Sequence, residues 1–253
     1  MSKIIALANQ KGGVGKTTTA INLSAAMGKK GKKVLVIDID PQGNTTSGFG
    51  IEKNELEKTV YDLILGECSI KECIIPDVCE NLSIIPANVN LAAAEIELID
   101  AEKKEYVLKN EVDWIKDQYD YIFIDCPPSL SMLTVNAMTT AESVLVPIQC
   151  EYYAMEGLSQ LIHTINLVKK KLNPSLKMEG VVFTMYDSRT NLSQEVVDIV
   201  KEALEERVFE TTIPRNVRLA EAPSYGKPIC EYDAKSAGAE SYSKLADEII
   251  KIK

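Results

Sequence analysis

Residues 4–18 read IIALANQKGGVGKTT, and this stretch decides the fold. The short apolar run predicts a buried strand, and a helical pattern begins at Lys16 without a linker. The glycines between them allow a tight turn whose backbone N–H groups point at phosphate oxygens beside a helix N-terminus. Lys16 is expected to reach the β- and γ-phosphates, and Thr17 to bind Mg²⁺. The loop therefore predicts a nucleoside triphosphate site made of Lys11, Gly12, Gly13, Val14, Gly15, Lys16, Thr17 and Thr18.

Short apolar, β-branched runs alternate with helical patterns along the rest of the chain. Most runs are continuously apolar, as expected of parallel strands buried on both faces. This alternation predicts an α/β fold of the doubly wound type, with a mostly parallel sheet and helices on both faces. No repeat or linker interrupts residues 1–253, which favours a single domain. The expected strands are 4–9, 34–38, 82–87, 121–125, 143–148, 180–185 and 208–214, and the expected helices are 16–30, 102–118, 131–141, 153–172, 192–206 and 239–252.

Two of the later strands are expected to end in aspartate. The run 34–38 ends at Asp38, with Asp40 following in DIDPQGN, and the run 121–125 ends at Asp125. Because the carboxyl ends of parallel strands form the ligand edge of the sheet, all three carboxylates should face the phosphate loop. A carboxylate there can activate an attacking water or hold a water on Mg²⁺. An Asp-Pro turn would explain one of the two aspartates near residue 40, but not both.

The loop KGGVGKT and the motif DxDPQ together resemble those of the ParA/MinD group of P-loop ATPases. The resemblance implies an ATP-dependent homodimer in which Lys11 reaches the partner's nucleotide, and Gly12 is small because the partner backbone approaches closely. A lysine placed in trans would act on the phosphoryl group as an arginine finger does. The same resemblance assigns water activation to Asp40, support of Mg²⁺ or the loop to Asp38, and a magnesium-bound water to Asp125.

Most of the chain is similar to the short chromosomal ParA proteins of the Soj type. The similar segments run from residue 6 to about residue 230 and include DIDPQGNTTSG, YIFIDCPPSL, SRTNL and IPRNVRLAEAPSYGKPI. By this resemblance Pro214 packs on adenine and Asn216 hydrogen-bonds its edge, which makes ATP the nucleotide. Arg189 and Arg218 match arginines that contact DNA. The first strand begins at once, so we expect no N-terminal helix-turn-helix extension of the kind that larger relatives carry.

The resemblance also implies a cycle and its partners. The ATP-bound dimer is expected to bind double-stranded DNA without sequence preference, and a ParB-type centromere-binding protein to stimulate hydrolysis and release. A replication initiator is a further implied partner, because the family also acts in replication and sporulation control. Basal turnover should be slow, since the site is completed only on assembly. The expected location is the cytoplasm, on the nucleoid.

The net charge limits how such a chain can meet DNA. It has 28 Lys and Arg against 37 Asp and Glu, a formal charge of −9, so the molecule as a whole repels polyanions. DNA contact must therefore be local. A single surface arginine is as often paired with a neighbouring acid as engaged by a ligand, so charge alone leaves the question open. The arginines fall in one stretch, at Arg189, Arg207, Arg215 and Arg218.

Two other classes of ATPase stay open. A MinD-like protein would dock on lipid through a C-terminal amphipathic helix, but Asp247 and Glu248 break its basic character, so we expect this helix to pack in the core. A metallocluster-assembly ATPase would use cysteines such as Cys126 and Cys150. The six cysteines are irregularly spaced and the chain has one histidine, which argues against a zinc site or a disulfide framework.

Overall fold

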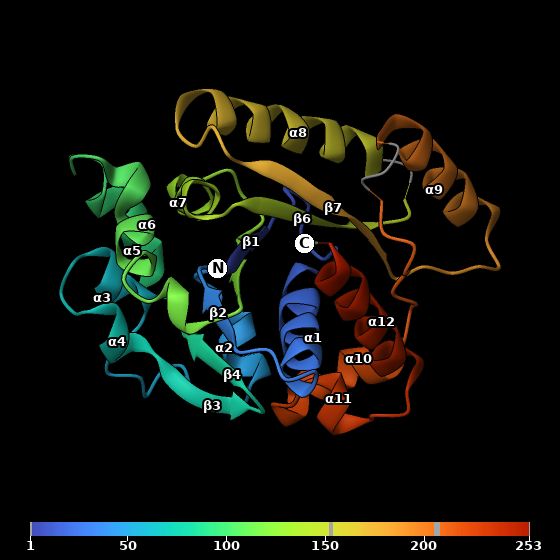
Figure 1. Cartoon of the computed structure of the whole chain (residues 1–253), viewed down its shortest axis with the longest axis horizontal. Coiled ribbons are helices and arrows are strands. Elements are labelled where there is room, and N and C mark those ends of the chain that lie inside the picture. Colours follow the sequence, from blue (N-terminus) through green and yellow to red (C-terminus); the bar gives the residue numbers. More distant parts are fainter. Residues whose placement is uncertain (1, 152–153, 205–207, 253) are drawn as a thin grey trace.

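The fold is built on a seven-stranded sheet in the order β3-β4-β2-β5-β1-β6-β7 (Figure 1). The computed structural model describes residues 2–151, 154–204 and 208–252. Every pair of neighbouring strands is parallel except β3 and β4, which are antiparallel. The strands are β1 (Lys3–Leu7), β2 (Val34–Asp38), β3 (Ile75–Cys79), β4 (Leu82–Ile85), β5 (Tyr121–Asp125), β6 (Ser143–Gln149) and β7 (Lys177–Thr184). The predicted mostly parallel α/β sheet is confirmed.

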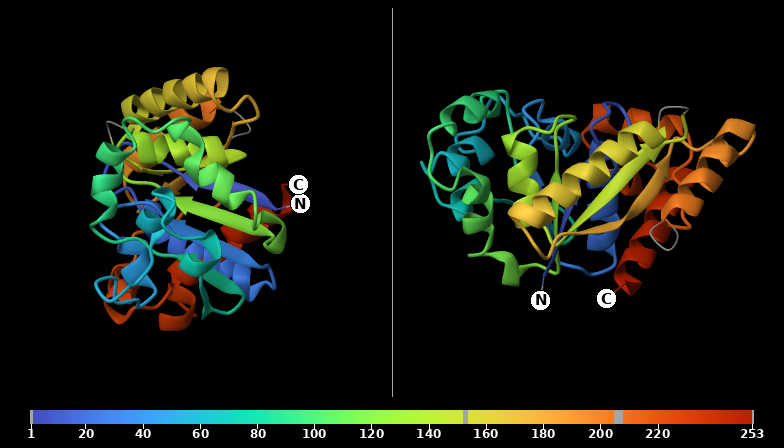
Figure 2. Two further views of the ribbon diagram at one scale, coloured as in Figure 1. Left: turned by 90° about the vertical axis from the view of Figure 1, so that its left-hand side faces the viewer. Right: turned by 90° about the horizontal axis from the view of Figure 1, so that it is seen from above.

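Helices cover both faces of the sheet (Figures 1 and 2). One face is covered by α1 (Lys16–Lys29), α10 (Val217–Glu221), α11 (Ile229–Tyr232) and α12 (Ala237–Lys251). The other face is covered by α3 (Val60–Ile64), α4 (Ile70–Cys73), α5 (Leu91–Glu97), α6 (Val107–Val112), α7 (Met132–Thr140), α8 (Ala154–Lys171) and α9 (Asn191–Leu204). The short helix α2 (Asn44–Gly48) follows β2.

The continuous apolar runs of the central strands are explained by burial on both sides. Successive side chains of a strand point to opposite faces. In β1, Ile4 and Ala6 belong to one core cluster while Ile5 and Leu7 belong to the other, and all four are buried. The sheet therefore separates two hydrophobic cores, and its carboxyl edge is left to the loops that carry polar residues.

The predicted strand 208–214 is wrong. It makes only isolated bridges, from Val208 to Val181 and from Pro214 to Tyr186, and its Phe209 and Ile213 N–H groups donate to the β7 carbonyls of Val181 and Phe183 at 2.9 and 2.8 Å. Between them, the backbone N–H groups of Glu210 and Thr211 donate to the Glu248 carboxylate, at 3.0 and 2.9 Å, instead of to a strand. A side chain of α12 thus takes the donors that a ladder would need.

The edge strand β3 was not predicted. It contains Pro76 and Asp77, both disfavoured in strands, and Asp77 has a left-handed φ of 55°. The pairing of β3 with β4 is irregular in register. An edge position tolerates such residues because one side of the strand needs no partner.

The predicted helix 102–118 is also wrong as one element. Lys103 has a left-handed φ of 53°, so a helix can begin only after it. A 3₁₀ turn at Lys104–Tyr106 then leads into α6, and a second 3₁₀ turn follows at Lys116–Gln118. The other predicted helices lie within two residues of the observed ones where the structure describes them, while residues 153, 205 and 206 fall outside its description.

The two ends of the chain meet at the sheet. The Lys3 ammonium donates to the Ile252 carbonyl at 3.1 Å and pairs with the buried Glu179 carboxylate at 2.6 Å. The described ends of the chain lie on the same side of the molecule (Figure 2). Within the residues described, no helix combines the length and apolar character needed to cross a bilayer.

Candidate nucleotide-binding site

The glycine-rich loop joins β1 to α1 at the carboxyl edge of the sheet. The Asn9 side chain opens it, because Oδ1 accepts from the Lys11 N–H at 3.0 Å while Nδ2 donates to the Pro147 carbonyl at 2.8 Å. Gly13 and Gly15 have φ values of 73° and 87°, in the left-handed region that favours glycine. These contacts hold the loop open at the N-terminus of α1.

Lys16 lies inside this loop and is 6% exposed. Its Nζ donates to the Lys11 carbonyl at 3.2 Å, so the ammonium sits within the curve of the loop backbone. Burial lowers the pKa of Lys16, against the nearby Asp125 charge that raises it. A poorly hydrated ammonium inside a ring of N–H groups is suited to an anion with several oxygens, such as a triphosphate.

Asp125 at the end of β5 has one satisfied and one unsatisfied oxygen. Its Oδ2 accepts from the hydroxyls of Thr17 at 2.9 Å and Thr45 at 2.7 Å. Its Oδ1 is buried and has no hydrogen-bond partner among the described residues. Burial raises the pKa of Asp125. A buried, half-satisfied carboxylate beside a threonine hydroxyl fits a hydrated Mg²⁺ ion, since a metal-bound water would supply the missing donor.

Asp38 lies beside Asp125 on the neighbouring strand and is satisfied by its own loop. Its Oδ1 accepts from the Asp40 N–H at 3.1 Å, and its Oδ2 accepts from the N–H and hydroxyl of Thr46, at 2.9 and 2.8 Å. Burial and the charge of Asp125 raise the pKa of Asp38. In this structure Asp38 anchors α2, so its contacts favour the loop-supporting role over metal binding.

Asp40 lies at the rim of the same cavity. Its Oδ1 accepts from the Gln42 N–H at 2.9 Å, which turns the chain toward α2. The side chain lines the cavity together with Lys16 and Thr17. A carboxylate in this position can reach a water beside the terminal phosphate.

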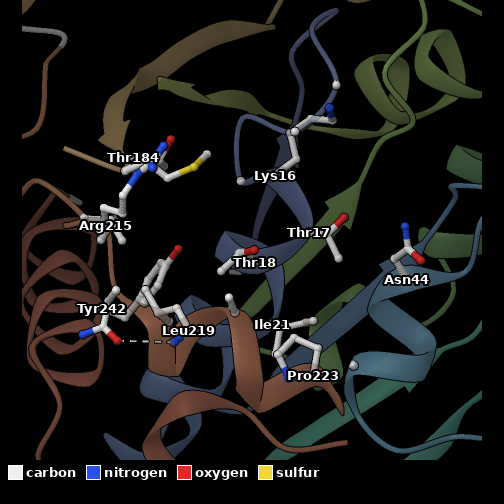
Figure 3. Close-up of a pocket in the computed structure, with 18 of the residues that line it drawn as sticks. Lys16, Thr17, Thr18, Ile21, Asn44, Thr184, Arg215, Leu219, Pro223 and Tyr242 are labelled. Carbon is white, nitrogen blue, oxygen red and sulfur yellow. Dashed lines mark hydrogen bonds between the residues drawn. The ribbon is translucent and has the colours of Figure 1, made fainter. Parts of the chain in front are cut away.

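The cavity has a volume of about 760 Å³, enough for a nucleotide. Residues from both ends of the chain line it, as Figure 3 shows with Lys16, Thr17 and Thr18 on one side and Leu219 and Tyr242 on another. The phosphate-loop side is polar, whereas the C-terminal side carries Pro223, Leu219 and Tyr242. The cavity thus offers an anion site next to an apolar wall.

Pro214 and Asn216, to which the family resemblance assigns base binding, both line the cavity. The Asn216 Oδ1 caps α10 by accepting from the N–H groups of Arg218 at 2.8 Å and Leu219 at 3.4 Å. That oxygen is therefore engaged, and the group that Asn216 can offer to a base is its Nδ2 donor. A purine base presents ring nitrogens that accept such a bond.

Lys11 is held within its own chain. Its ammonium pairs with the Glu151 carboxylate after β6. Gly12, next to it, is not confined by neighbours, because an added Cβ would meet no described heavy atom within 4 Å. The roles predicted for Lys11 and Gly12 both require a second copy of the chain, whose nucleotide Lys11 would reach and whose backbone would approach Gly12.

The arginine stretch is divided by the fold, and each described DNA-contact candidate has an acidic neighbour. Arg189, in the loop before α9, makes two hydrogen bonds to Asp187, at 2.9 and 2.7 Å, and holds the pKa of Asp187 well below its usual range. Arg218 in α10 pairs with Glu221 at 2.9 Å and lies 3.6 Å from Asp233. Arg207 lies outside the described residues. Both described arginines are therefore paired with acidic side chains, as ordinary surface arginines often are.

Three residues that complete the site were not singled out from the sequence. Thr45 donates to Asp125, and Thr184 at the end of β7 donates to the Val14 carbonyl at 2.7 Å. Tyr242 of α12 lines the cavity, with its hydroxyl 3.2 Å from that of Thr19. Of the three, only Thr45 could have been identified from the sequence, because the pair Thr45 and Thr46 follows DIDPQGN near the end of a predicted strand.

The apolar side of α12, which a lipid-docking ATPase would expose, and the cysteines that a cluster-assembly ATPase would use are buried. The apolar side of α12 packs against α1, with Leu245 and Ile249 in the shared core, as expected of a core helix. Cys126 and Cys150 are both buried and belong to the same hydrophobic core.

Comparisons with known proteins agree with this geometry. A family model described as an AAA domain matches residues 2–178. The sporulation initiation inhibitor protein Soj of Bacillus subtilis (strain 168) is 55% identical over 249 residues, which is 98% of each chain. The chromosome partitioning protein ParA of Myxococcus xanthus (strain DK1622) is 51% identical over 251 residues, covering 99% of this chain and 89% of that one. The crystal structure of cobyrinic acid a,c-diamide synthase from Mycobacterium smegmatis with bound ADP and magnesium has a TM-score of 0.88 and 37% identity, covering 99% of this chain and 95% of that one.

Proposed function

Since the chain belongs to the ParA/Soj family of chromosome-partitioning ATPases, we propose that ATP switches it between a monomer and a DNA-binding homodimer. It is an ATP hydrolase that uses Mg²⁺. In the proposed cycle the ATP-bound dimer binds double-stranded DNA without sequence preference. A ParB-type partner then stimulates hydrolysis, and the protein leaves the DNA.

The observation that carries the ATPase chemistry is the unsatisfied oxygen of Asp125. Thr17 and Asp125 would hold Mg²⁺, which neutralises phosphate charge when bound. Lys16 binds the phosphate oxygens from within the loop, and Asp40 orients and deprotonates the attacking water. Pro214 packs on the adenine ring while the Asn216 amide nitrogen donates to its edge.

A second copy of the chain is needed to complete this site. The proposal rests on Lys11 and Gly12, since Lys11 is engaged by Glu151 in the single chain and Gly12 has space that its own chain leaves open. A partner backbone could approach Gly12 closely, and Lys11 could then exchange Glu151 for the partner's phosphate. Because exposed ion pairs contribute little, breaking the Lys11–Glu151 pair costs less than a phosphate contact returns.

DNA binding is supported by where the two arginines lie. Their side chains are 86% exposed at Arg189 and 55% exposed at Arg218, so phosphate can reach them. The two arginines follow segments that are joined by the bridge between Tyr186 and Pro214. Pro214 lines the nucleotide cavity, so both DNA-contact candidates extend from the base-binding side of the site. A few phosphate contacts per copy give weak, salt-sensitive binding, and dimerisation doubles them.

The test measures DNA retention of Asp40→Ala protein, which should keep ATP bound, with ATP, with ADP and without nucleotide. Retention of arbitrary duplex only with ATP, and its loss at high salt, would support the proposal. A dimer that retains no DNA in any state would overturn it. Arg189→Ala and Arg218→Ala should each weaken retention without changing dimerisation, which light scattering would follow. Lys170→Ala, on the exposed end of α8, is the matched control for loss of one positive charge.

The proposal extends to the setting in which the cycle runs. The protein would act on the nucleoid in the cytoplasm as a single ATPase domain, with a replication initiator as a further partner. A role in sporulation control would match the name of the B. subtilis relative, a sporulation initiation inhibitor protein. Neither a lipid-docking nor a cluster-assembly role gains support from the buried side of α12 or from the buried Cys126.

A further inference from the structure

Two cysteine thiols touch each other away from the nucleotide site. The Sγ atoms of Cys68 and Cys73 are 3.1 Å apart, within hydrogen-bonding distance, and all six cysteines are free thiols in the described ranges. A disulfide bond is about 2.0 Å long, so the two sulfurs need to approach by only about 1 Å. The pair is therefore close to bonding geometry in the folded chain.

The turn that brings these cysteines together is fixed by a capping box. Cys68 lies directly before Ser69, the N-cap residue of α4, and Cys73 is the last residue of that helix. The Ser69 N–H and hydroxyl both donate to the Glu72 carboxylate, at 2.8 and 2.6 Å. This reciprocal cap sets the single turn of α4, so the two sulfurs are held at their close distance rather than meeting by chance.

The two thiols differ in access. Cys68 is half-buried and can be reached by a small molecule, whereas Cys73 is 1% exposed and donates to the Thr59 carbonyl at 3.3 Å. Burial raises the pKa of the Cys73 thiol, and the neighbouring Cys68, Asp62 and Glu72 raise it further. Cys73 is thus a poor first nucleophile, but it is well placed to attack a sulfur that is already attached to Cys68.

We propose that Cys68 and Cys73 form a reversible disulfide by exchange with a small disulfide of the glutathione class. The Cys68 thiolate attacks one sulfur of the oxidant, forms a mixed disulfide and releases one thiolate. The Cys73 sulfur then loses its proton to solvent, attacks the Cys68 sulfur and expels the second thiolate of the oxidant. Both protein thiols are oxidised, and the small disulfide is reduced to two thiols.

Disulfide formation would also change a contact of the helix next to the pair. The hydrogen bond from Cys73 to the Thr59 carbonyl is lost when the thiol loses its proton. Thr59 is the N-cap residue of α3, and it forms a capping box with Asp62. The oxidised turn therefore acts on the start of α3, which makes this a site at which redox conditions can modify the folded protein.

The test is peptide mapping of the folded, full-length protein after incubation with glutathione disulfide and alkylation of the remaining thiols. Lys71 lies between the two cysteines, so trypsin places Cys68 in residues 59–71 and Cys73 in residues 72–103. We expect a linked pair of these two peptides that dithiothreitol separates. Because residues 72–103 also contain Cys79, the variant Cys79→Ser is the matched control and should keep the link.

Two further variants identify the order of the steps. In Cys73→Ala protein, glutathione should stay attached to Cys68, because the thiol that displaces it is gone. In Cys68→Ser protein, no link should form and Cys73 should stay unmodified, while far-UV circular dichroism shows that the fold is kept. The proposal is overturned if wild-type protein carries glutathione on Cys68 without the linked peptides, if both cysteines remain reduced, or if Cys79→Ser removes the link.

Discussion

Replacing Asp125 with asparagine should stabilise the protein in the absence of nucleotide while removing its response to ATP and Mg²⁺. An asparagine can keep its carbonyl oxygen toward Thr17 and Thr45, whose hydroxyls donate to Asp125 at 2.9 and 2.7 Å. What disappears is a buried negative charge with one oxygen unsatisfied. Burial raises the pKa of Asp125, and one unit of pKa shift corresponds to about 1.4 kcal/mol, so removing the charge stabilises the folded state. This gain offsets the cost of leaving the NH₂ group of the new asparagine without a hydrogen-bond acceptor.

The net gain should be about 1–2 kcal/mol in the free energy of unfolding, or roughly 2–8 °C in melting temperature for a chain of this length. The size of the gain depends on pH. Because the folded-state pKa of Asp125 lies above its ordinary value of 3.8, the charge costs stability above the raised pKa, and this cost disappears as the pH falls toward 3.8. The advantage of Asp125→Asn should therefore be largest near about pH 8 and smaller near about pH 5.

Asp38→Asn is the matched control, because it also removes a buried carboxylate whose pKa burial raises. Asp38 accepts from the Asp40 N–H on one oxygen and from the N–H and hydroxyl of Thr46 on the other. An amide can accept on one atom only and turns its NH₂ group toward a donor, a cost of about 1–3 kcal/mol that opposes the relief of burial, so this variant should not keep its fold while losing the response to ATP and Mg²⁺ as Asp125→Asn does.

Thermal unfolding followed by far-UV circular dichroism, with and without ATP and Mg²⁺, measures all of these effects. At a ligand concentration about 100 times its Kd, wild-type protein should gain about 2.7 kcal/mol, and Asp125→Asn should gain almost nothing. If Asp125→Asn melts below wild type without ligand near about pH 8, or gains as much from the ligand, the assignment of Asp125 as a half-satisfied metal site is refuted.

Three further substitutions test other parts of the structure. Thr45→Val removes a donor to the buried Asp125 carboxylate, so half-maximal ATP hydrolysis should need about tenfold more Mg²⁺ and the free energy of unfolding should fall by about 1–3 kcal/mol. Asn216→Asp keeps the oxygen that caps α10 but loses the amide donor, so calorimetry should find ATP binding about tenfold weaker at an unchanged melting temperature. Gly226→Ala adds a Cβ at a φ of 62°, 2.5 Å from the Gly50 Cα, and should lose about 2–3 kcal/mol in urea unfolding.

The central strands could be predicted from the sequence because the apolar pattern that buries them lies within each strand. The runs 34–38 and 121–125 are apolar on both faces, and a parallel strand in mid-sheet needs nothing else. The segment 208–214 resembles a strand in its apolar and β-branched residues but lies at the sheet edge, where Phe209 and Ile213 bond to β7 and the Glu248 carboxylate accepts from the N–H groups between them. The seven residues of this segment do not indicate that a side chain from a helix about forty positions later accepts their backbone hydrogen bonds.

The same division between local and distant contacts applies to the site. Lys16 and the aspartates at strand ends are predictable, since a glycine turn and a strand end place them without further help. The contact of Thr184 with the Val14 carbonyl is set by where β7 ends in the assembled sheet. Likewise, the ion pair of Lys11 with Glu151 joins residues that only the order of β1 and β6 brings together.

The sharing of the cavity between the two ends of the chain bears on how the protein is made. The phosphate loop leaves the ribosome early, but Tyr242, on the opposite wall, lies in the last helix of the described chain. In addition, β1 lies between β5 and β6, so it has no neighbouring strand until more than a hundred further residues have been synthesised. The complete cavity therefore exists only after α12 has been synthesised and has packed against α1. Until β5 has been synthesised, the apolar residues of β1 have no strand to pair with, and a chain that stops before that point keeps them unpaired.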